Sequence, residues 1–259
     1  MSEALQLARA TIGEVAGRPA GVRAWNSIDQ GADDGAGAGE REGMFARLLS
    51  LYPVTARILG PGFFAYAVDS YLDERASGAL ETSDPCGSLP HYLATEPHCR
   101  HLRYVADVAR FEGYVHEVAQ AAVGLPMDPD RLAGSLSAAH RISFVLSPAY
   151  ALMASIWPVD RIWLAHGQGQ VAALQVSCRL RHFEIWRQDG CTLYRRLATA
   201  DYRFRRGLQM GVPLAAAAAA ALEAERDFDL ATALASVLQQ GVVTSFVRRP
   251  LSPIGGPSR

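Results

Sequence analysis

The sequence contains no lysine, so all 25 basic residues are arginines. It has only four cysteines and no C-x-x-C pair, which argues against a zinc ribbon or a disulfide scaffold and predicts reduced thiols. No apolar run approaches the roughly 20 residues that cross a bilayer. The first residues also lack the basic-then-apolar order of a signal peptide. We therefore expect a globular, cytoplasmic protein that does not enter a membrane.

Familiar catalytic motifs are missing as well. There is no G-x-S-x-G and no Walker A loop, and "GQGQ" at 167–170 lacks the third glycine of a dinucleotide loop. The sequence therefore predicts no catalytic residue, no cofactor and no resident metal.

Charge is unevenly distributed along the chain. Residues 1–124 hold 10 arginines against 16 acidic residues, a net charge of −6, and residues 125–259 hold 15 against 10, a net charge of +5. A basic half suggests an acidic partner, either nucleic acid or an acidic peptide, although two oppositely charged domains can also attract each other. The alanine run at 215–221 is interpreted as compositional drift.

The first half of the chain has helical patterning. A short first helix and a mobile Gly-, Ala- and acid-rich loop are expected within residues 1–43, followed by a helical domain over 44–124. Pro53 should break or kink its first helix, and Gly60 should end it. The longest helix of this half is expected in "RYVADVARFEGYVHEVAQAAVG".

The second half has mixed patterning. After a junction at "GLPMDPD", a mixed domain is expected over residues 132–249, with a frayed tail at 250–259. "RISFVLSPAYALMASIWPV" should supply strands, and the end of the domain should run helix, helix, strand, like a winged helix. The predicted class is α+β: an N-terminal all-helical domain, then a mixed α/β domain with a β-hairpin and a winged-helix-like tail.

The clearest local signal is the hairpin "FEIWRQDGCTLYRRL", in which Asp189 and Gly190 form the two-residue turn. That turn places three pairs of residues opposite each other, each apolar or oppositely charged as paired strands prefer. The pairs are Trp186 with Leu193, Glu184 with Arg195, and Ile185 with Tyr194.

Two groups of polar residues could bind a metal. Glu112 and His116 stand four residues apart on one helix face, but a di-iron bundle needs Glu-x-x-His and a second copy. The alternative is a helix carboxylate answered by an arginine and a hydrogen-bonded histidine. The second group lacks the C-x-x-C or H-x-x-x-H spacing with which zinc sites hold their ligands. It comprises Cys86, His91, His98, Cys99 and His101.

Arginines are concentrated on the hairpin and the helix after it. They form either a solvated face or a binding surface for an acidic chain. These arginines are Arg179, Arg181, Arg187, Arg195, Arg196, Arg203, Arg205 and Arg206.

Several blocks resemble the HvfC/BufC family in order and spacing. "LYPVTARILGPGFFAYAVDSYL", "GSLPHYL" and "RYVADVARFEGYVHEVAQA" are similar to its N-terminal domain, whose usual pattern has a Phe-Pro, a Leu-x-Gly-x-x-Phe-Phe and a Tyr-Leu-x-Asp-x-Ala-Arg-x-Glu helix. "LSPAYALMASIWPVDRIW", "FEIWRQDG" and "DFDLATALASVLQQGVV" resemble its second domain. The likeness covers most of residues 44–247, but Tyr52 replaces the usual Phe before Pro53, and the usual lead-in is absent at "GEREGMF".

The resemblance implies an accessory protein without catalysis of its own, which partners a multinuclear non-heme iron enzyme that modifies ribosomally made peptides. Some members carry a DNA-binding label, which rests on fold likeness alone. We therefore expect a non-enzymatic subunit that binds an iron-dependent peptide-modifying oxidase, as a heterodimer, and the leader of a precursor peptide. The alternative is a sequence-specific DNA-binding regulator.

Two candidate surfaces follow from this expectation. An extended leader could add a strand to an unpaired hairpin edge, with arginines meeting its acidic residues. The peptide-binding candidates are Ile185, Trp186, Arg187, Leu193, Tyr194, Arg195 and Arg196. The candidates for the face toward the enzyme are Asp107, Arg110, Glu112 and His116.

Overall fold

The computed structural model describes residues 23–25, 39–78, 87–133, 136–169 and 176–248. Contacts group the described chain into two compact units. The helical unit comprises described residues within 26–117 and 153–181, and the sheet unit comprises those within 1–25, 118–152 and 182–259. Whether residues 44–124 and 132–249 fold as separate domains stays a prediction.

The α+β class is confirmed, because a helical region precedes the strands apart from the short β1. In the first half the elements are β1 (Arg23–Trp25), α2 (Glu40–Leu51), α3 (Pro53–Leu59), α4 (Pro61–Ala76), α5 (Leu89–Thr95), the 3-10 helix η1 (Pro97–Cys99) and α6 (Val105–Gln120). In the second half they are α7 (Pro129–Ala133), η2 (Leu136–Arg141), β2 (Ile142–Leu146), β3 (Tyr150–Ser155), α8 (Val159–Gly167), β4 (Arg181–Gln188), β5 (Cys191–Leu197), α9 (Thr199–Gln209), α10 (Leu214–Ala224), α11 (Leu230–Gln239) and β6 (Val243–Arg248).

Pro53 and Gly60 mark the start and the end of α3, as predicted. Helix α2 ends at Leu51, and Pro53 is the first residue of α3, where its missing N–H costs nothing. Gly60 follows α3 with φ of +77°. The predicted loop was too long, because α2 already begins at Glu40. The predicted first helix lies outside the described residues.

The strands within the described residues form two antiparallel sheets, with orders β1-β5-β4-β3 and β2-β6. The hairpin β4–β5 has the predicted register: Trp186 faces Leu193, and Ile185 faces Tyr194. Asp189 and Gly190 have φ of +52° and +77°, the double positive φ of a type I′ turn, whose twist matches that of the flanking strands.

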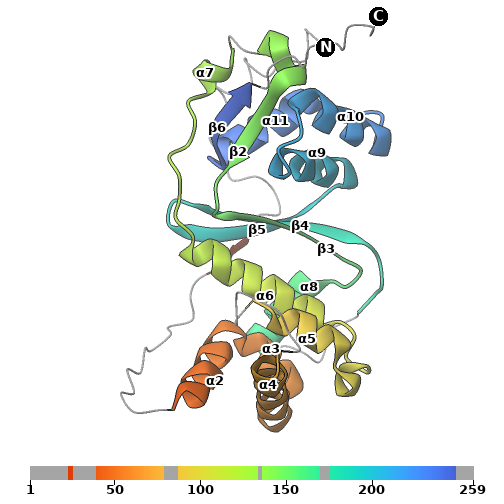
Figure 1. Cartoon of the computed structure of the whole chain (residues 1–259). Helices are drawn as coiled ribbons and strands as arrows, with labels where there is room; N and C mark the ends of the chain where they lie inside the picture. Colours follow the sequence, from red (N-terminus) through yellow and green to blue (C-terminus); the bar gives the residue numbers. More distant parts are fainter. Residues whose placement is uncertain (1–22, 26–38, 79–86, 134–135, 170–175, 249–259) are drawn as a thin grey trace, which may run out of the picture. The chain divides into compact units, whose positions relative to one another are not determined.

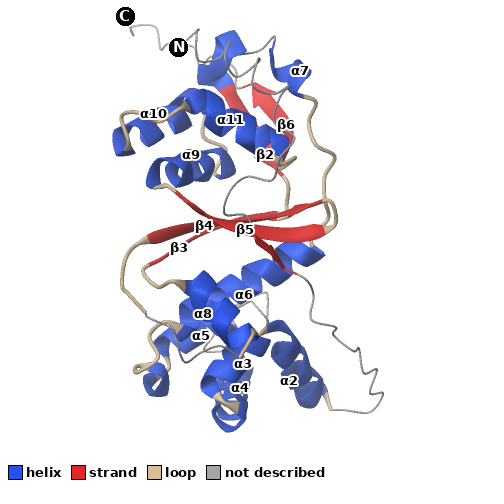
Figure 2. Ribbon diagram, turned by 180° about the vertical axis from the view of Figure 1, so that it is seen from behind, coloured by secondary structure: helices blue, strands red, loops and turns tan. Residues whose placement is uncertain are grey.

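The end of the described chain runs helix, helix, strand as predicted (Figures 1 and 2). Asp229 caps α11 by accepting from the N–H groups of Ala231 and Thr232, and Gly241 follows this helix with φ of +67°. Strand β6 pairs with β2, which lies about a hundred residues earlier in the chain, rather than with a neighbouring strand. The winged-helix-like order is thus completed by a distant strand. The predicted tail at 250–259 lies outside the described residues.

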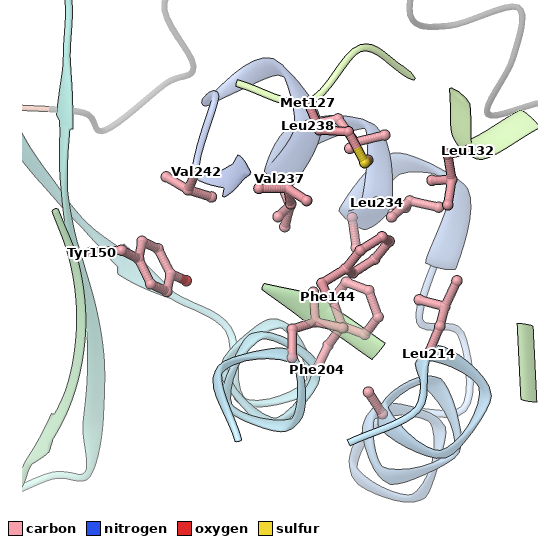
Figure 3. Packing of buried hydrophobic residues seen from close by; sticks show 14 of the residues in the cluster. Met127, Leu132, Phe144, Tyr150, Phe204, Leu214, Leu234, Val237, Leu238 and Val242 are labelled. Carbon is pink, nitrogen blue, oxygen red and sulfur yellow. The ribbon is translucent and has the colours of Figure 1, made fainter. Parts of the chain in front are cut away.

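The core of the sheet unit lies among α9, α10, α11 and β2. Figure 3 shows Phe144, Phe204, Leu214 and Leu234 directed into it. The helical unit has its own core, built on Phe64, Val68, Tyr71 and neighbouring apolar side chains.

The alanine run has a packing role that composition did not reveal. A Cβ added to Gly207 on α9 would lie 2.9 Å from the Cβ of Ala217 on α10, so the two helices approach closely there. Ala217 and Ala221 are buried, whereas Ala219 on the same helix is exposed. Small residues at this crossing are therefore required by packing.

This packing gives a first prediction. Ala217→Leu should lower the free energy of unfolding by about 2 kcal/mol, because the larger side chain overpacks the contact with Gly207. The control Ala219→Leu should change it by less than about 0.5 kcal/mol. Urea denaturation measures both values, and equal effects of the two variants would contradict a close α9–α10 contact.

Helix α8 was not predicted: only its first residue, Val159, lies in the stretch that was expected to supply strands. Among the helices that the structure describes, none has both the length and the apolar character needed to span a bilayer.

Candidate functional site

Asp107 and Arg110 of α6 connect this helix to the segment that ends β3. Asp107 accepts from Arg110 Nη2 at 2.8 Å and also from the Ser155 hydroxyl. Arg110 donates to the Ala154 carbonyl at 3.2 Å. Ser155 Oγ in turn accepts from the Trp157 N–H at 3.0 Å. Asp107 and Arg110 therefore position the end of β3, and both side chains are hydrogen-bonded within the helical unit.

Glu112 lies inside the helical unit, with an exposed fraction of 4%. Its carboxylate accepts from the N–H groups of Val54 and Thr55, at 2.8 and 3.0 Å, and from the Thr55 hydroxyl at 2.8 Å. These donors belong to the first turn of α3, so Glu112 caps that helix from another helix. Burial raises its pKa to about 7, against the lowering effect of these hydrogen bonds.

An arginine was the predicted partner of Glu112 in the non-metal interpretation, whereas the structure gives it the backbone N–H groups of Val54 and Thr55, the Thr55 hydroxyl and the Trp163 side chain. The available signal was Pro53, which marks the start of a helix whose next N–H groups need acceptors.

His116 is half-buried, and its pKa is lowered, first by burial and then by the positive charge of Arg47. The Glu112 carboxylate is already engaged with α3. Within the described residues there is no group of three His, Cys, Asp or Glu side chains that could hold a metal ion.

The second polar group is only partly described, because Cys86 lies outside the described residues. The buried Glu96 accepts from His98 Nδ1 at 2.6 Å and from the Tyr92 hydroxyl at 2.8 Å. The pKa of the Glu96 carboxyl is lowered. Burial is the largest single effect and raises it, but the hydrogen bonds from His98 and Tyr92 together outweigh burial. Cys99 is buried, which raises the pKa of its thiol to about 11 and makes it a poor nucleophile. His91 and His101 are exposed.

The apolar candidates on the hairpin are all buried. Ile185 and Trp186 on β4 have exposed fractions of 0% and 1%, and Leu193 and Tyr194 on β5 have 4% and 3%. Trp186 and Leu193 belong to the core of the sheet unit. Neither face of the ribbon therefore offers these side chains to a peptide, which leaves the backbone along the edge as the part able to pair.

The three candidate arginines differ in exposure and in the groups that their side chains contact. Arg195 donates to Glu184 at 2.8 Å and to the Ser236 hydroxyl at 3.2 Å, and its guanidinium lies 5.5 Å from the ring centre of Trp186. Arg187 donates to the Ala119 carbonyl at 2.7 Å. Arg196 is the exposed member of the three.

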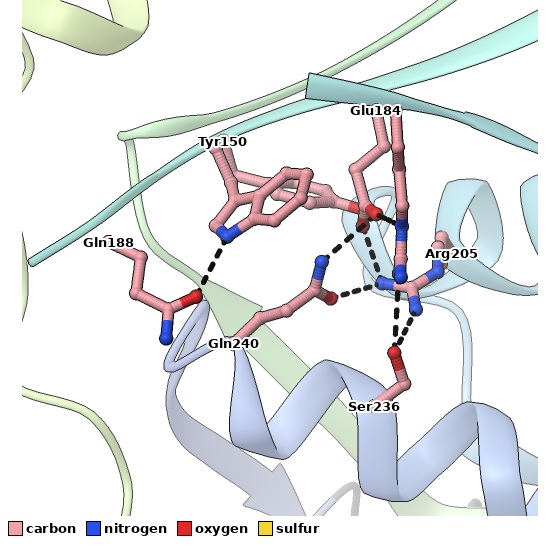
Figure 4. Close-up of polar contacts among 8 residues, drawn as sticks. Tyr150, Glu184, Gln188, Arg205, Ser236 and Gln240 are labelled. Atoms are coloured by element: carbon pink, nitrogen blue, oxygen red, sulfur yellow. Dashed lines mark hydrogen bonds and ion pairs between the residues drawn. The ribbon is translucent and has the colours of Figure 1, made fainter. Parts of the chain in front are cut away.

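Glu184 is the centre of a buried polar network (Figure 4). Its carboxylate accepts from Arg205 at 2.5 Å, from the Tyr150 hydroxyl at 2.9 Å and from Gln240 at 3.0 Å, besides Arg195. Arg205 also donates to the Gln240 side-chain oxygen at 2.7 Å and to Ser236 at 3.0 Å. Both charges of the central pair are almost fully buried. The network therefore joins β4, α9 and α11 around one carboxylate.

Two pKa shifts follow from this network. Burial and the Glu184 charge raise the pKa of Tyr150 well above its usual value. The pKa of Arg205 is also raised. Burial is the largest single effect and lowers it, but Glu184, Tyr150 and Asp201 together outweigh burial. Both groups therefore stay protonated at neutral pH. The reading of Arg205 as part of a solvated or binding face was wrong, because its exposed fraction is 1%.

The outer edge of β5 pairs with β1, so the prediction of an unpaired hairpin edge needs correction. Arg23, Ala24 and Trp25 pair antiparallel with Tyr194, Leu193 and Thr192. Strand β1 thus pairs with three of the seven residues of β5. Strand β4 lies between β5 and β3 and is an inner strand.

No protein-family model matches this chain, and no curated protein matches it in sequence.

Proposed function

We propose that this chain is a non-enzymatic accessory subunit, which binds the leader of a ribosomally made precursor peptide and partners an iron-dependent, peptide-modifying oxidase. The sequence blocks that resemble the HvfC/BufC family are the reason for naming this class of partner. We place this assembly in the cytoplasm. In this proposal the sheet unit holds the leader, and the helical unit contributes to the contact with the enzyme.

The observation that supports leader binding best is the pairing of β1 with β5. An extended segment of only three residues, from a distant part of the sequence, sits beside the hairpin through main-chain pairing. A peptide that adds a strand uses the same backbone groups and gains affinity without needing an exposed apolar pocket. This matters here because the apolar side chains of the hairpin are buried.

Charge adds a second supporting feature. Arg196 is exposed on β5, two residues beyond the end of the β1 pairing at Tyr194. An acidic leader residue that lies beside Arg196 gains a modest, salt-dependent attraction. Because it is exposed, Arg196 is our candidate for recognising leader charge, in place of Arg195, whose side chain has an exposed fraction of 11%.

The alternative of a sequence-specific DNA-binding protein gains little support from the arrangement of charges. In the winged-helix-like order, α11 is the helix that precedes the last strand and would be expected to enter the major groove. Its sequence, LATALASVLQ, contains no arginine or lysine, and six of its ten residues are buried. DNA recognition depends on such basic side chains to contact phosphates and bases.

The proposal predicts that a precursor peptide is encoded beside the gene. It is tested with synthetic copies of that peptide's leader, methylated at one backbone nitrogen at a time. A leader that adds as a strand directs alternate N–H groups toward β5. We therefore expect losses of about tenfold or more in affinity at every second position, and little change between them. Calorimetry with the full chain measures each affinity.

The unmethylated leader and a scrambled leader of the same composition serve as controls. Losses without the two-residue alternation would contradict strand addition. No binding of the unmethylated leader, either to the chain alone or to its complex with the co-encoded enzyme, would contradict the proposed function.

A further inference from the structure

The strand β1 occupies part of the edge at which a leader would pair. It is three residues long, and the pairing that the described residues show joins it to Thr192, Leu193 and Tyr194 alone. Each hydrogen bond of such a pairing contributes on the order of 1 kcal/mol. A longer peptide that runs in the same direction can therefore replace it at a modest cost in free energy.

The hairpin geometry indicates which backbone groups face β1. In a two-residue hairpin the residues that close the turn, here Gln188 and Cys191, form a hydrogen-bonded pair. Backbone groups alternate along a strand, so those of Leu193 point to β4, whereas those of Thr192 and Tyr194 point outward to β1. The partner of Tyr194 is Arg23, and the partner of Leu193 is Ala24.

We propose that β1 is an internal placeholder: residues 23–25 cover the outer edge of β5 in the free protein and are displaced when an extended peptide pairs there. This inference rests on the proposed function in naming the leader as the displacing peptide. The incoming strand takes the place of β1 and runs antiparallel to β5, in the direction that carries it past Tyr194 toward Arg196.

A placeholder has two physical consequences. It protects an edge that would otherwise pair with other chains and aggregate. It also lowers the apparent affinity of the edge for any peptide. That affinity equals the affinity of the uncovered edge multiplied by the fraction of molecules in which the edge is uncovered. If β1 is seated in about nine molecules out of ten, removing it tightens peptide binding about tenfold.

Two proline substitutions in β1 give a matched test, because proline lacks the N–H group. Arg23→Pro removes an N–H that faces Tyr194, whereas Ala24→Pro removes one that points away from β5. Arg23→Ala controls for the lost charge. The probe is a fluorescent peptide with the chain's own residues 20–28, AGVRAWNSI, and fluorescence anisotropy with the full-length variants measures its affinity.

We expect Arg23→Pro to bind this probe about tenfold more tightly than the parent, and Ala24→Pro and Arg23→Ala to stay within about twofold of it. Equal affinity for all four proteins, or no binding of the probe to Arg23→Pro, would overturn the placeholder.

A second arm adds the unlabelled leader as a competitor and separates this inference from the proposed function. Displacement of the probe from Arg23→Pro supports both. If the probe binds Arg23→Pro tightly but the leader fails to displace it, β1 is a placeholder for another peptide and the proposed function fails. If the leader binds all variants with equal affinity, the placeholder fails and leader binding stands.

Discussion

Glu184→Gln should lower the free energy of unfolding by about 3–5 kcal/mol, the largest effect that we expect from a single side chain. The substitution keeps the shape of the side chain but removes the charge that faces two arginines, one of them with an exposed fraction of 1%. Arg205 then remains buried without a counter-charge from Glu184, and that loss is costly. Urea denaturation, followed by circular dichroism and tryptophan fluorescence, measures the change.

The control for this prediction is Glu223→Gln, an exposed carboxylate on α10. It should change the free energy of unfolding by less than about 0.5 kcal/mol. A Glu184→Gln variant as stable as this control would mean that the buried pair contributes nothing. Because Arg195 shares the Glu184 carboxylate, charge reversal at Arg195 would disturb the fold and cannot serve as a test of peptide binding.

The β-hairpin was predictable because its information is local. Asp189 and Gly190 tolerate the positive φ that a type I′ turn demands, and the turn then determines every cross-strand pair. The same reasoning placed Glu184 opposite Arg195. It could not reveal Arg205, which reaches Glu184 from a helix 21 residues further along the chain.

The role of Glu112 was hidden for a similar reason. Spacing along α6 showed that Glu112 and His116 share a helix face, but not what lies against that face. The carboxylate meets Val54 and Thr55, which are 58 and 57 residues away in sequence. A pattern within one helix therefore suggested a site, whereas the tertiary contact shows a helix cap.

The alanine run and the strand β1 show two further limits of sequence reading. Seven consecutive alanines carry no periodicity of polarity, so nothing distinguishes the buried Ala217 from the exposed Ala219. Residues 23–25 are too short a segment to be recognised as a strand. They form a strand because they pair with the edge of β5, a tertiary contact that their own sequence does not reveal.

The second large effect concerns pH. The folded-state pKa of Glu112 is raised to about 7 from an ordinary value of 4.5. A group of this kind contributes stability that is fully present below the unfolded pKa and is lost as pH rises through the folded pKa. The helical unit should therefore lose roughly 3 kcal/mol of stability from Glu112 between about pH 4.5 and pH 8.

Glu112→Gln should remove this pH dependence, because glutamine does not titrate, although it retains an oxygen that can accept from the first turn of α3. The lowered pKa of His116 acts in the opposite direction, since a histidine of this kind destabilises the fold as pH falls. The difference between parent and variant cancels that contribution. Thermal unfolding from pH 5 to pH 8 measures it, with Glu42→Gln as the exposed control. Parallel curves for parent and Glu112→Gln would show that the carboxylate does not titrate in this range, and that its hydrogen bonds to Val54 and Thr55 outweigh its burial.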